Sequence, residues 1–361
     1  MCTVFRENSK RELLESAKLA LRLRTLVAKL TPAAKVHSVM PSFTPPNLSD
    51  VLEARKRLAP FLGNTPFRRH RSLENELGCE VFVKHENHNP TGSFKVRGGI
   101  SLVSQLGPDE KSSGIISAST GNHGQSIALA GSIFGVKTTI VVPEESNPTK
   151  IAAIRTLGAE VIHHGADFDE ARKHVEELSK KRGARYIHSA NEPLLIAGVA
   201  TYALEMLEAE PDLDVVLVPV GGGSGAAGCS LVMKTLAPHV QVIAVQAEAA
   251  PAAHLSWKEG RLKEARCSTF AEGLATRAGF ELTQRMLREY LDDFVLVGEE
   301  ELRDAILTYL EKTGTLAEGA GAASLAAAVK IRDRLQSKKV GLVLSGGNLS
   351  VEKLRRTLSG A

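Results

Sequence analysis

Lys95 lies in a run of residues that suits an amine used for chemistry. The run, Asn89-Pro-Thr-Gly-Ser-Phe-Lys-Val-Arg-Gly-Gly99, flanks the lysine with an aromatic residue, a hydroxyl residue and glycines. No acidic residue stands beside it to form a surface ion pair. Packing against an apolar wall lowers the pKa of a lysine, so that the neutral amine can form an imine with a carbonyl carbon. A lysine with a buried stem at the start of a helix is the structural alternative.

Three further loops combine glycines with hydroxyl or amide side chains, and each follows an apolar run. They read Ser117-Ala-Ser-Thr-Gly-Asn-His-Gly-Gln125, Gly221-Gly222-Gly223-Ser224-Gly225 and Ser345-Gly346-Gly347-Asn348. The first brings hydroxyls, an amide and backbone N–H groups to a helix start, where they could hold a carboxylate. An N-cap formed by Ser119 or Thr120 is the structural alternative there. Successive glycine amides ahead of a helix make the second loop a phosphate cradle.

The second loop also fits a different kind of site. Gly221, Gly223 and Ala226 match the GxGxxG/A fingerprint of dinucleotide-binding proteins, and Glu248 ends the next apolar run, where a ribose-binding acid belongs. A non-catalytic dinucleotide-binding module is therefore an alternative. That alternative gives no role to the lysine run or to the first of the three loops, so the phosphate cradle explains more of the chain.

Short apolar runs alternate with helical patterns from about residue 80 onward, as a parallel α/β sheet requires. The predicted strands are 81–84, 114–117, 138–142, 160–163, 215–218, 242–245, 293–296 and 340–344. The predicted helices are 125–134, 150–157, 170–181, 198–208, 225–236, 299–312 and 322–333. We therefore expect an α/β fold with two mostly parallel sheets. Ligands of such sheets bind at the carboxyl ends of the strands, where the glycine loops lie.

Length and composition limit the classes of function. A chain of 361 residues favours two lobes. The net charge of +4 is spread over interspersed acidic and basic residues without a long basic block, so nucleic-acid binding is not expected. No apolar run has the length of a membrane span, so no membrane partner is expected. Cys2, Cys79, Cys229 and Cys267 show no CxxC spacing, which favours free thiols in a reducing compartment and a cytoplasmic protein.

Residues 1–39 need a separate interpretation. The segment is basic and partly amphipathic, but Glu7, Glu12 and Glu15 argue against a transit peptide, and no signal-peptide core is present. A proline-rich run then begins at Met40. We interpret 1–39 as an N-terminal extension, either helical or disordered.

The four loops together resemble the motifs of fold-type II pyridoxal-phosphate enzymes, the family of the serine/threonine dehydratases and serine racemases. Ser93-Phe94-Lys95 followed by Arg97-Gly98 is similar to their Schiff-base lysine motif, and the other loops follow in the family's order between Asn47 and Leu349. The resemblance implies a two-domain, tryptophan-synthase-β-like fold. It places a large domain at 40–104 and 189–361 and a small domain at 105–188, and it implies a homodimer.

The resemblance also implies how pyridoxal 5'-phosphate (PLP) is held. Lys95 would form the Schiff base, Phe94 would pack beside the ring, and Asn122 would bond the ring hydroxyl. Gly221, Gly222, Gly223, Ser224 and Gly225 would hold the phosphate. Ser345 would meet the ring nitrogen, and the segment Glu272-Gly273 would pass beside the ring. Glu318 falls where the family often places an acid near the cofactor, and an acid at a helix N-terminus is the structural alternative.

For the substrate, the resemblance implies that Ser119, Thr120, Asn122 and His123 bind the carboxylate of an amino acid. Lys95 and Thr120 are the predicted catalytic residues. Many dehydratases have alanine at the Thr120 position and racemases have a serine that works as an acid and base. The family's divalent-cation site uses a glutamate and an aspartate six residues later. Here Glu248 is a weak candidate ligand because His254 takes the second position, which weakens the case for a metal.

The activity implied is β-elimination from a β-hydroxy-α-amino acid. A serine at the ring nitrogen leaves that nitrogen largely unprotonated, which shortens the life of the carbanion and favours prompt elimination. Threonine and serine are the default substrates, and phenylserine or 3-hydroxyaspartate stay open. Amino acid racemisation through Thr120 is an alternative, and β-replacement of the cysteine-synthase type is a weaker one.

Overall fold

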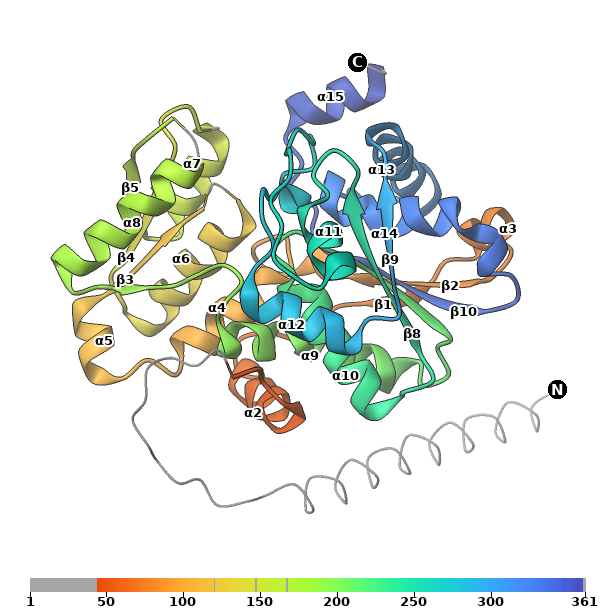
Figure 1. Cartoon of the computed structure of the whole chain (residues 1–361), viewed down its shortest axis with the longest axis horizontal. Helices are drawn as coiled ribbons and strands as arrows, with labels where there is room; N and C mark the ends of the chain where they lie inside the picture. The colour runs from red at the N-terminus through yellow and green to blue at the C-terminus, as the bar shows by residue number, and fades with distance from the viewer. Residues whose placement is uncertain (1–43, 120, 147, 167, 360–361) are drawn as a thin grey trace.

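The computed structural model describes residues 44–359 except 120, 147 and 167 (Figure 1). The described chain contains two sheets that lie side by side. The six-stranded sheet has the order β1 (Phe67–Arg69), β2 (Glu80–His85), β10 (Lys339–Leu344), β7 (Val215–Pro219), β8 (Gln241–Ala247) and β9 (Asp293–Val297). The four-stranded sheet has the order β5 (Glu160–His163), β4 (Thr138–Val142), β3 (Ile115–Ala118) and β6 (Arg185–Tyr186).

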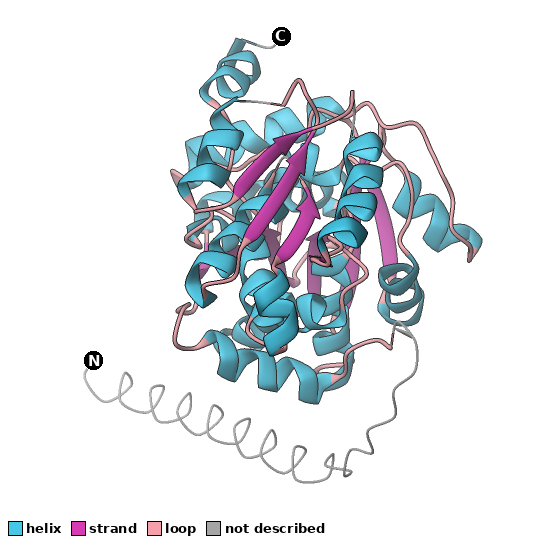
Figure 2. Cartoon of the chain, turned by 90° about the vertical axis from the view of Figure 1, so that its left-hand side faces the viewer, coloured by secondary structure: helices cyan, strands magenta, loops and turns pink. Residues whose placement is uncertain are grey.

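Helices enclose the strands of these sheets (Figure 2). In the first half of the described chain they are α2 (Leu48–Leu58), α3 (Arg71–Leu77), α4 (Lys95–Val103), α5 (Pro108–Ser113), α6 (Asn122–Phe134), α7 (Pro148–Thr156), α8 (Phe168–Arg182) and α9 (Pro193–Ala209). Then follow α10 (Ser224–Leu236), α11 (Ala252–Glu259), α12 (Glu281–Tyr290), α13 (Glu299–Thr313), α14 (Gly319–Lys330) and α15 (Val351–Ser359). Short 3-10 turns are η1 (Glu86–His88), η2 (Glu272–Leu274) and η3 (Arg332–Arg334).

The predicted α/β fold with two mostly parallel sheets is confirmed. All eight predicted strands are present, and β1 with β2 is the one antiparallel pair among the named strands of the described residues. The sequence pattern missed β1 and β6, which have three and two residues at the edges of their sheets. Such short edge strands carry too few residues to show an apolar alternation.

Six of the seven predicted helices start one to five residues later than the real ones. Helix α9 begins at Pro193 instead of residue 198, because proline is well suited to the first turn of a helix. Helix α14 begins at Gly319 instead of residue 322. Its Gly321 lies so close to the backbone of Gly346 that an added Cβ would approach that carbonyl oxygen to 2.1 Å. Seven helices were not predicted, namely α2, α3, α4, α5, α11, α12 and α15.

Helix α9 forms the centre of the apolar core. All its residues from Leu195 to Leu207 are buried, and it packs against α2, α4 and α10. A helix that is apolar on all sides must be covered on all sides. Helix α4, which begins at Lys95, packs between α9 and α6. The lysine therefore sits on a helix that is held from two directions.

Some predictions concern residues that the structure does not describe. The extension 1–39, the boundary at Met40, Cys2 and the catalytic candidate Thr120 all lie outside the described part. No helix of the described part has both the length and the apolar character that crossing a membrane requires. Cys79, Cys229 and Cys267 are free thiols.

Candidate active site

The loop of Lys95 is fixed to the loop that follows β10. Ser93 forms an isolated antiparallel bridge with Gly346, and the Phe94 N–H donates to the Ser345 carbonyl at 3.1 Å. Parallel pairing of β10 with β2 brings these loops to the same edge of the sheet. The structure therefore places the predicted residues Phe94, Lys95 and Ser345 together.

The Lys95 amine is enclosed and has no carboxylate partner in the described structure. Its Nζ donates to the Ser224 Oγ at 2.9 Å and lies 5.1 Å from the centre of the Phe94 ring. The residue keeps some accessible surface, but desolvation of its side chain lowers the pKa of Lys95 to about 8. A substantial fraction of this amine is neutral at a pH near 8, as a nucleophile requires.

The glycine loop after β7 is built for close approach of another group. Gly223 has a φ of +92°, a conformation that favours glycine, and it precedes α10 without a side chain that caps the helix. A Cβ at Gly221 would lie 2.0 Å from the Gly273 carbonyl oxygen, and one at Gly225 would lie 3.3 Å from the Phe94 ring. A helix start with no side-chain cap leaves N–H groups and a positive dipole end for an anion.

The loop after β3 uses Ser119 for its own folding. The Ser119 Oγ accepts hydrogen bonds from the N–H groups of Gly121 at 3.2 Å and Gly124 at 3.0 Å. Gly121, and not Ser119, is the N-cap residue of α6, but the Ser119 Oγ still satisfies an N–H group of the first helical turn. The hydroxyl proton stays available, because an oxygen that accepts these bonds can still donate one.

His123 is buried in the same loop and is neutral. Its Nε2 lies 3.0 Å from the Ser117 Oγ, which itself donates to the Ile187 carbonyl at 2.8 Å, so the Nε2 carries the hydrogen. Burial, with a smaller contribution from Lys95, lowers the pKa of His123 to about 3. Its Nδ1 has no hydrogen-bond partner among the described residues. An unpaired buried acceptor of this kind is uncommon away from functional sites.

Asn122 connects Glu318, another predicted residue, to Asn348. Its Nδ2 donates to the Glu318 Oε1 at 2.6 Å, and its Oδ1 accepts from the Asn348 Nδ2 at 2.7 Å. Burial raises the pKa of Glu318, and the hydrogen bond from Asn122 offsets only part of that rise. Glu318 occupies the N-cap position of α14 but makes no capping hydrogen bond. Its carboxyl group is thus directed to Asn122 and not used to start the helix.

The segment Glu272-Gly273 lies between the glycine loop and Glu318. The Gly273 carbonyl faces Gly221, and a Cβ at Gly273 would lie 3.8 Å from the Glu318 Oε1. A cavity here is lined in part by Lys150, Glu272, Gly273, Glu318, Asn348 and Lys353. Lys150 of α7 and Lys353 of α15 both form ion pairs with Glu272. The site is therefore bordered by segments from distant parts of the chain.

Glu248 and His254 do not join the site. The Glu248 carboxylate is exposed and pairs with the Lys330 ammonium at 2.9 Å, and His254 packs edge-on against Phe294. In the described residues, no group of three histidine, cysteine or acidic side chains is arranged to hold a metal ion. The Glu248 carboxylate is thus paired with a lysine, and its weak candidacy as a metal ligand stays a prediction.

Several residues near the site were missed by sequence reasoning. His188 accepts N–H bonds from Ala190 and Asn191 on its Nδ1, and burial lowers its pKa to about 4. Asn348 was part of a quoted loop but was given no role. Arg97 was read only as part of the lysine motif, and its contacts are described below. No local pattern marks His188, because its significance comes from its position next to Lys95 and His123 in space.

The sequence and the fold of this chain are similar to those of known proteins. The model of the pyridoxal-phosphate dependent enzyme family matches residues 58–346. The L-threonine ammonia-lyase of Thermotoga maritima is 40% identical over 313 residues, which cover 86% of this chain and 78% of that protein. The processed form of threonine deaminase isoform 2 from Solanum lycopersicum superimposes with a TM-score of 0.82 at 30% identity, covering 92% of this chain and 99% of that one. Maize serine racemase gives a TM-score of 0.82 at 28% identity over 88% and 99% of the two chains.

The chain belongs to the family of pyridoxal-phosphate dependent enzymes. The predicted resemblance to fold-type II enzymes is confirmed, and PLP is the cofactor of this family. A separate dinucleotide-binding module is therefore the wrong interpretation of the loop 221–226. The residues of the site fit PLP. A helix start without a side-chain cap follows glycines that leave room for a phosphate, and a desolvated lysine lies 2.9 Å from Ser224.

Proposed function

We propose that the protein is a PLP-dependent ammonia-lyase that converts a β-hydroxy-α-amino acid, threonine or serine in the first place, to a 2-oxo acid and ammonia. One observation carries the proposal. A lysine amine without a counter-ion, with its pKa lowered to about 8, lies at the entrance of a glycine cradle. Similarity to an L-threonine ammonia-lyase over 86% of the chain supports the choice of reaction.

The cofactor would be held by residues of three loops. Gly221, Gly222, Gly223, Ser224 and Gly225 would bind its phosphate, Phe94 would pack against its ring, and Ser345 would meet its ring nitrogen. When bound, PLP supplies an aldehyde for imine formation and a ring that accepts electrons from the Cα–H bond. Asn122 would bond the ring hydroxyl with the Nδ2 hydrogen that Glu318 leaves free.

Lys95 would act twice in the reaction. Its amine would hold the cofactor through an imine, and once free it would take up the Cα proton of the substrate as a general base. A pKa of about 8 makes the neutral amine available and still makes it a base strong enough to accept that proton. His123 and His188 are neutral at this pH, so neither adds a full charge beside Lys95.

The loop after β3 would bind the substrate carboxylate. The start of α6 presents backbone N–H groups there, together with Ser119, Asn122 and His123. Fixing the carboxylate sets the direction of the Cα–H bond, which is the main contribution of such a loop to rate. Thr120 lies outside the described residues, and its catalytic role stays a prediction.

Racemisation of an amino acid is the second candidate function. The fold likeness to maize serine racemase favours it, because that structure covers 88% of this chain. Both reactions begin with loss of the Cα proton, and they differ in whether a proton returns or the β-hydroxyl leaves. Chiral chromatography of the recovered amino acid separates them.

The assembly, domains and compartment complete the proposal. We expect a homodimer, a large domain at 40–104 and 189–361, and a small domain at 105–188. The four-stranded sheet, which lies within the proposed small domain, supports that division. Three free cysteines in the described part support a reducing, cytoplasmic setting.

A 2-oxo acid assay over threonine, serine, phenylserine and 3-hydroxyaspartate tests the proposal. The purified protein should be yellow from its imine and should release a 2-oxo acid and ammonia in equal amounts from at least one of these substrates. Borohydride should bleach the colour by reducing the imine, and the Lys95→Ala variant should lack the colour. A yellow protein that interconverts the two enantiomers of serine without releasing ammonia would make the racemase the correct assignment.

A further inference from the structure

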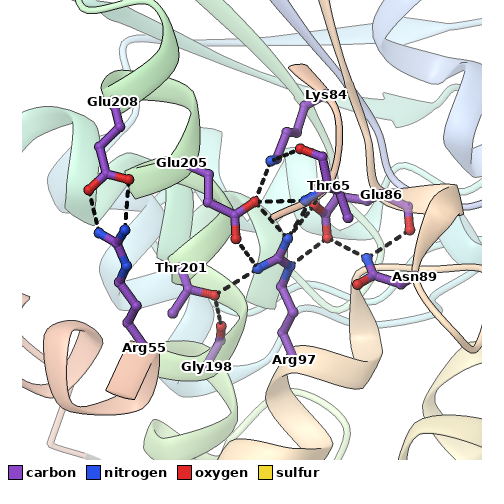
Figure 3. A network of polar contacts seen from close by, with 10 residues as sticks. All are labelled: Arg55, Thr65, Lys84, Glu86, Asn89, Arg97, Gly198, Thr201, Glu205 and Glu208. Carbon is purple, nitrogen blue, oxygen red and sulfur yellow. Dashed lines mark hydrogen bonds and ion pairs between the residues drawn. The ribbon is translucent and has the colours of Figure 1, made fainter. Parts of the chain in front are cut away.

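A buried ionic network surrounds the side chain of Arg97, two residues after Lys95 (Figure 3). Arg97 is 2% exposed, and its guanidinium binds two carboxylates, each through two nitrogens. It donates to Glu86 at 2.8 and 2.9 Å and to Glu205 at 2.6 and 2.9 Å. Burial alone would lower the pKa of Arg97, but the two carboxylates raise it above the usual value. Arg97 is therefore a permanent cation with fixed geometry.

The rest of the network saturates the two carboxylates. Lys84 pairs with Glu205 and donates to the Thr65 carbonyl at 2.8 Å, and the Thr65 hydroxyl donates to Glu86 at 2.5 Å. Asn89 donates to Glu86 at 2.9 Å. With two cations and two carboxylates, the network has no net charge. It joins β2, η1 and α9 to α4 (Figure 3).

The network lies on the opposite side of α4 from the amine. Residues two apart in an α-helix point about 200° from each other, so Arg97 faces α9 while Lys95 faces the glycine loop. The backbones of α4 and α9 are also in close contact, because a Cβ at Gly198 would lie 2.5 Å from the Arg97 carbonyl oxygen. The guanidinium therefore fixes the first turn of α4 relative to α9, both in its rotation about the helix axis and in its position along that axis.

Stability alone is a weak explanation for this arrangement. A buried ionic network costs much desolvation, and well-packed apolar residues are often as stable or more stable. What such a network does provide is one allowed geometry, since a guanidinium bound through both carboxylates tolerates little displacement. The functional consequence must lie in what α4 carries, which is Lys95.

We propose that Arg97 is a positioning residue: by binding Glu86 and Glu205 it fixes the first turn of α4 so that the Lys95 amine meets the carbonyl carbon of the cofactor. This inference rests on the proposed role of Lys95. Its effect works through position and not through charge, because the network is neutral. The titratable groups that face Lys95 are His123 and His188, and both lie on other segments.

The test compares Arg97→Met with Arg55→Met. Arg55 also binds a glutamate of α9, Glu208, through two nitrogens. It lies on α2 and is 41% exposed, so it is a matched control whose ion pair does not involve α4 (Figure 3). Each purified apoprotein is titrated with PLP, which forms an imine, and with pyridoxine 5'-phosphate, which has an alcohol in place of the aldehyde. Imine formation is followed by absorbance and alcohol binding by calorimetry.

We expect Arg97→Met to weaken imine formation about tenfold or more while pyridoxine 5'-phosphate binding changes by less than about threefold, since only the imine depends on the reach of Lys95. Arg55→Met should change neither. Arg97→Lys, which reaches one carboxylate at a time, should fall between wild type and Arg97→Met. Equal losses for both ligands would overturn the proposal, as would unchanged imine formation in a variant of reduced thermal stability. If Arg97→Met does not fold, the ratio of the two losses in Arg97→Lys decides.

The wild-type protein separates this inference from the proposed function. If wild type forms the imine but no 2-oxo acid, the choice of reaction fails while the Arg97 test stands. If Lys95→Ala binds PLP with the same absorbance as wild type, the role of Lys95 itself is wrong, and the positioning proposal is overturned with it.

Discussion

The two sides of the first turn of α4 differ in how completely their polar groups are satisfied. On the side of Arg97, two carboxylates and two cations bind one another with no net charge. On the side of Lys95, the amine has only a serine hydroxyl, and buried atoms of Thr91, Ser93 and His123 have no partner in the described structure. A fully bonded side holds the helix, so the incompletely bonded side can keep groups ready for a ligand.

Removal of the amine should have the largest effect. Lys95→Ala should reduce ammonia release by about a thousandfold or more, because the same group forms the imine and removes the Cα proton. Stopped assays with sensitive 2-oxo acid detection measure the residual rate. Thermal unfolding of the variant should stay close to wild type, since the lysine makes no ion pair in the described structure. If Lys95→Ala kept the wild-type rate, the Lys95 side of α4 would not be the reactive side.

Loss of a carboxylate from the Arg97 network should lower the free energy of unfolding. Glu205→Gln leaves Arg97 and Lys84 short of a buried negative charge, and removing one partner of such a pair costs about 3–5 kcal/mol. Urea unfolding measures this loss. Glu208→Gln, one turn further along α9, is the control. It breaks the partly exposed pair with Arg55 and should cost about 1 kcal/mol or less. Equal losses of unfolding free energy in the two variants would mean that the buried Arg97 network is no more important for stability than the partly exposed pair of Arg55 and Glu208.

The pH dependence of imine formation tests whether the Lys95 amine has the lowered pKa that burial predicts. Only the neutral amine reacts, and its pKa is lowered to about 8. The rate at which the apoprotein forms its imine should therefore rise with pH, about tenfold per unit below the pKa, and level off above about 8. A midpoint near 10.5, the usual value for lysine, would show that the amine is not desolvated. Rapid-mixing absorbance from pH 6 to 10 measures the profile.

Gly223→Ala should have the smallest of these effects. The φ of +92° strains an alanine, and its Cβ would lie 2.9 Å from Thr283, so phosphate affinity should fall about fivefold to thirtyfold, or about 1–2 kcal/mol. Equilibrium binding of pyridoxine 5'-phosphate measures it. Gly135→Ala is the matched control. It has a φ of +65° with open space around it, so it should lower stability slightly and leave binding unchanged.

The local parts of the site were accessible to sequence reasoning. Lys95, the glycines of 221–225 and the strands before them show up in short motifs and apolar runs, because these depend on neighbouring residues and backbone geometry. The same reasoning gave Glu248 a weak metal role and a possible ribose role. The structure shows that this carboxylate pairs at the surface with Lys330, a residue far away along the chain, which no local pattern indicates.

The sequence by itself determined which residues have the chemistry: an amine in an apolar setting, a phosphate cradle and a parallel α/β framework. Only the tertiary structure decided which of them work together. Placing β10 between β2 and β7 brings Ser345 to Phe94, and folding of distant segments joins Asn122 to Glu318 and Arg97 to Glu205. The physical reason is that these contacts depend on strand order and on the burial of charges more than 100 residues apart, which leave no periodic signal in the chain.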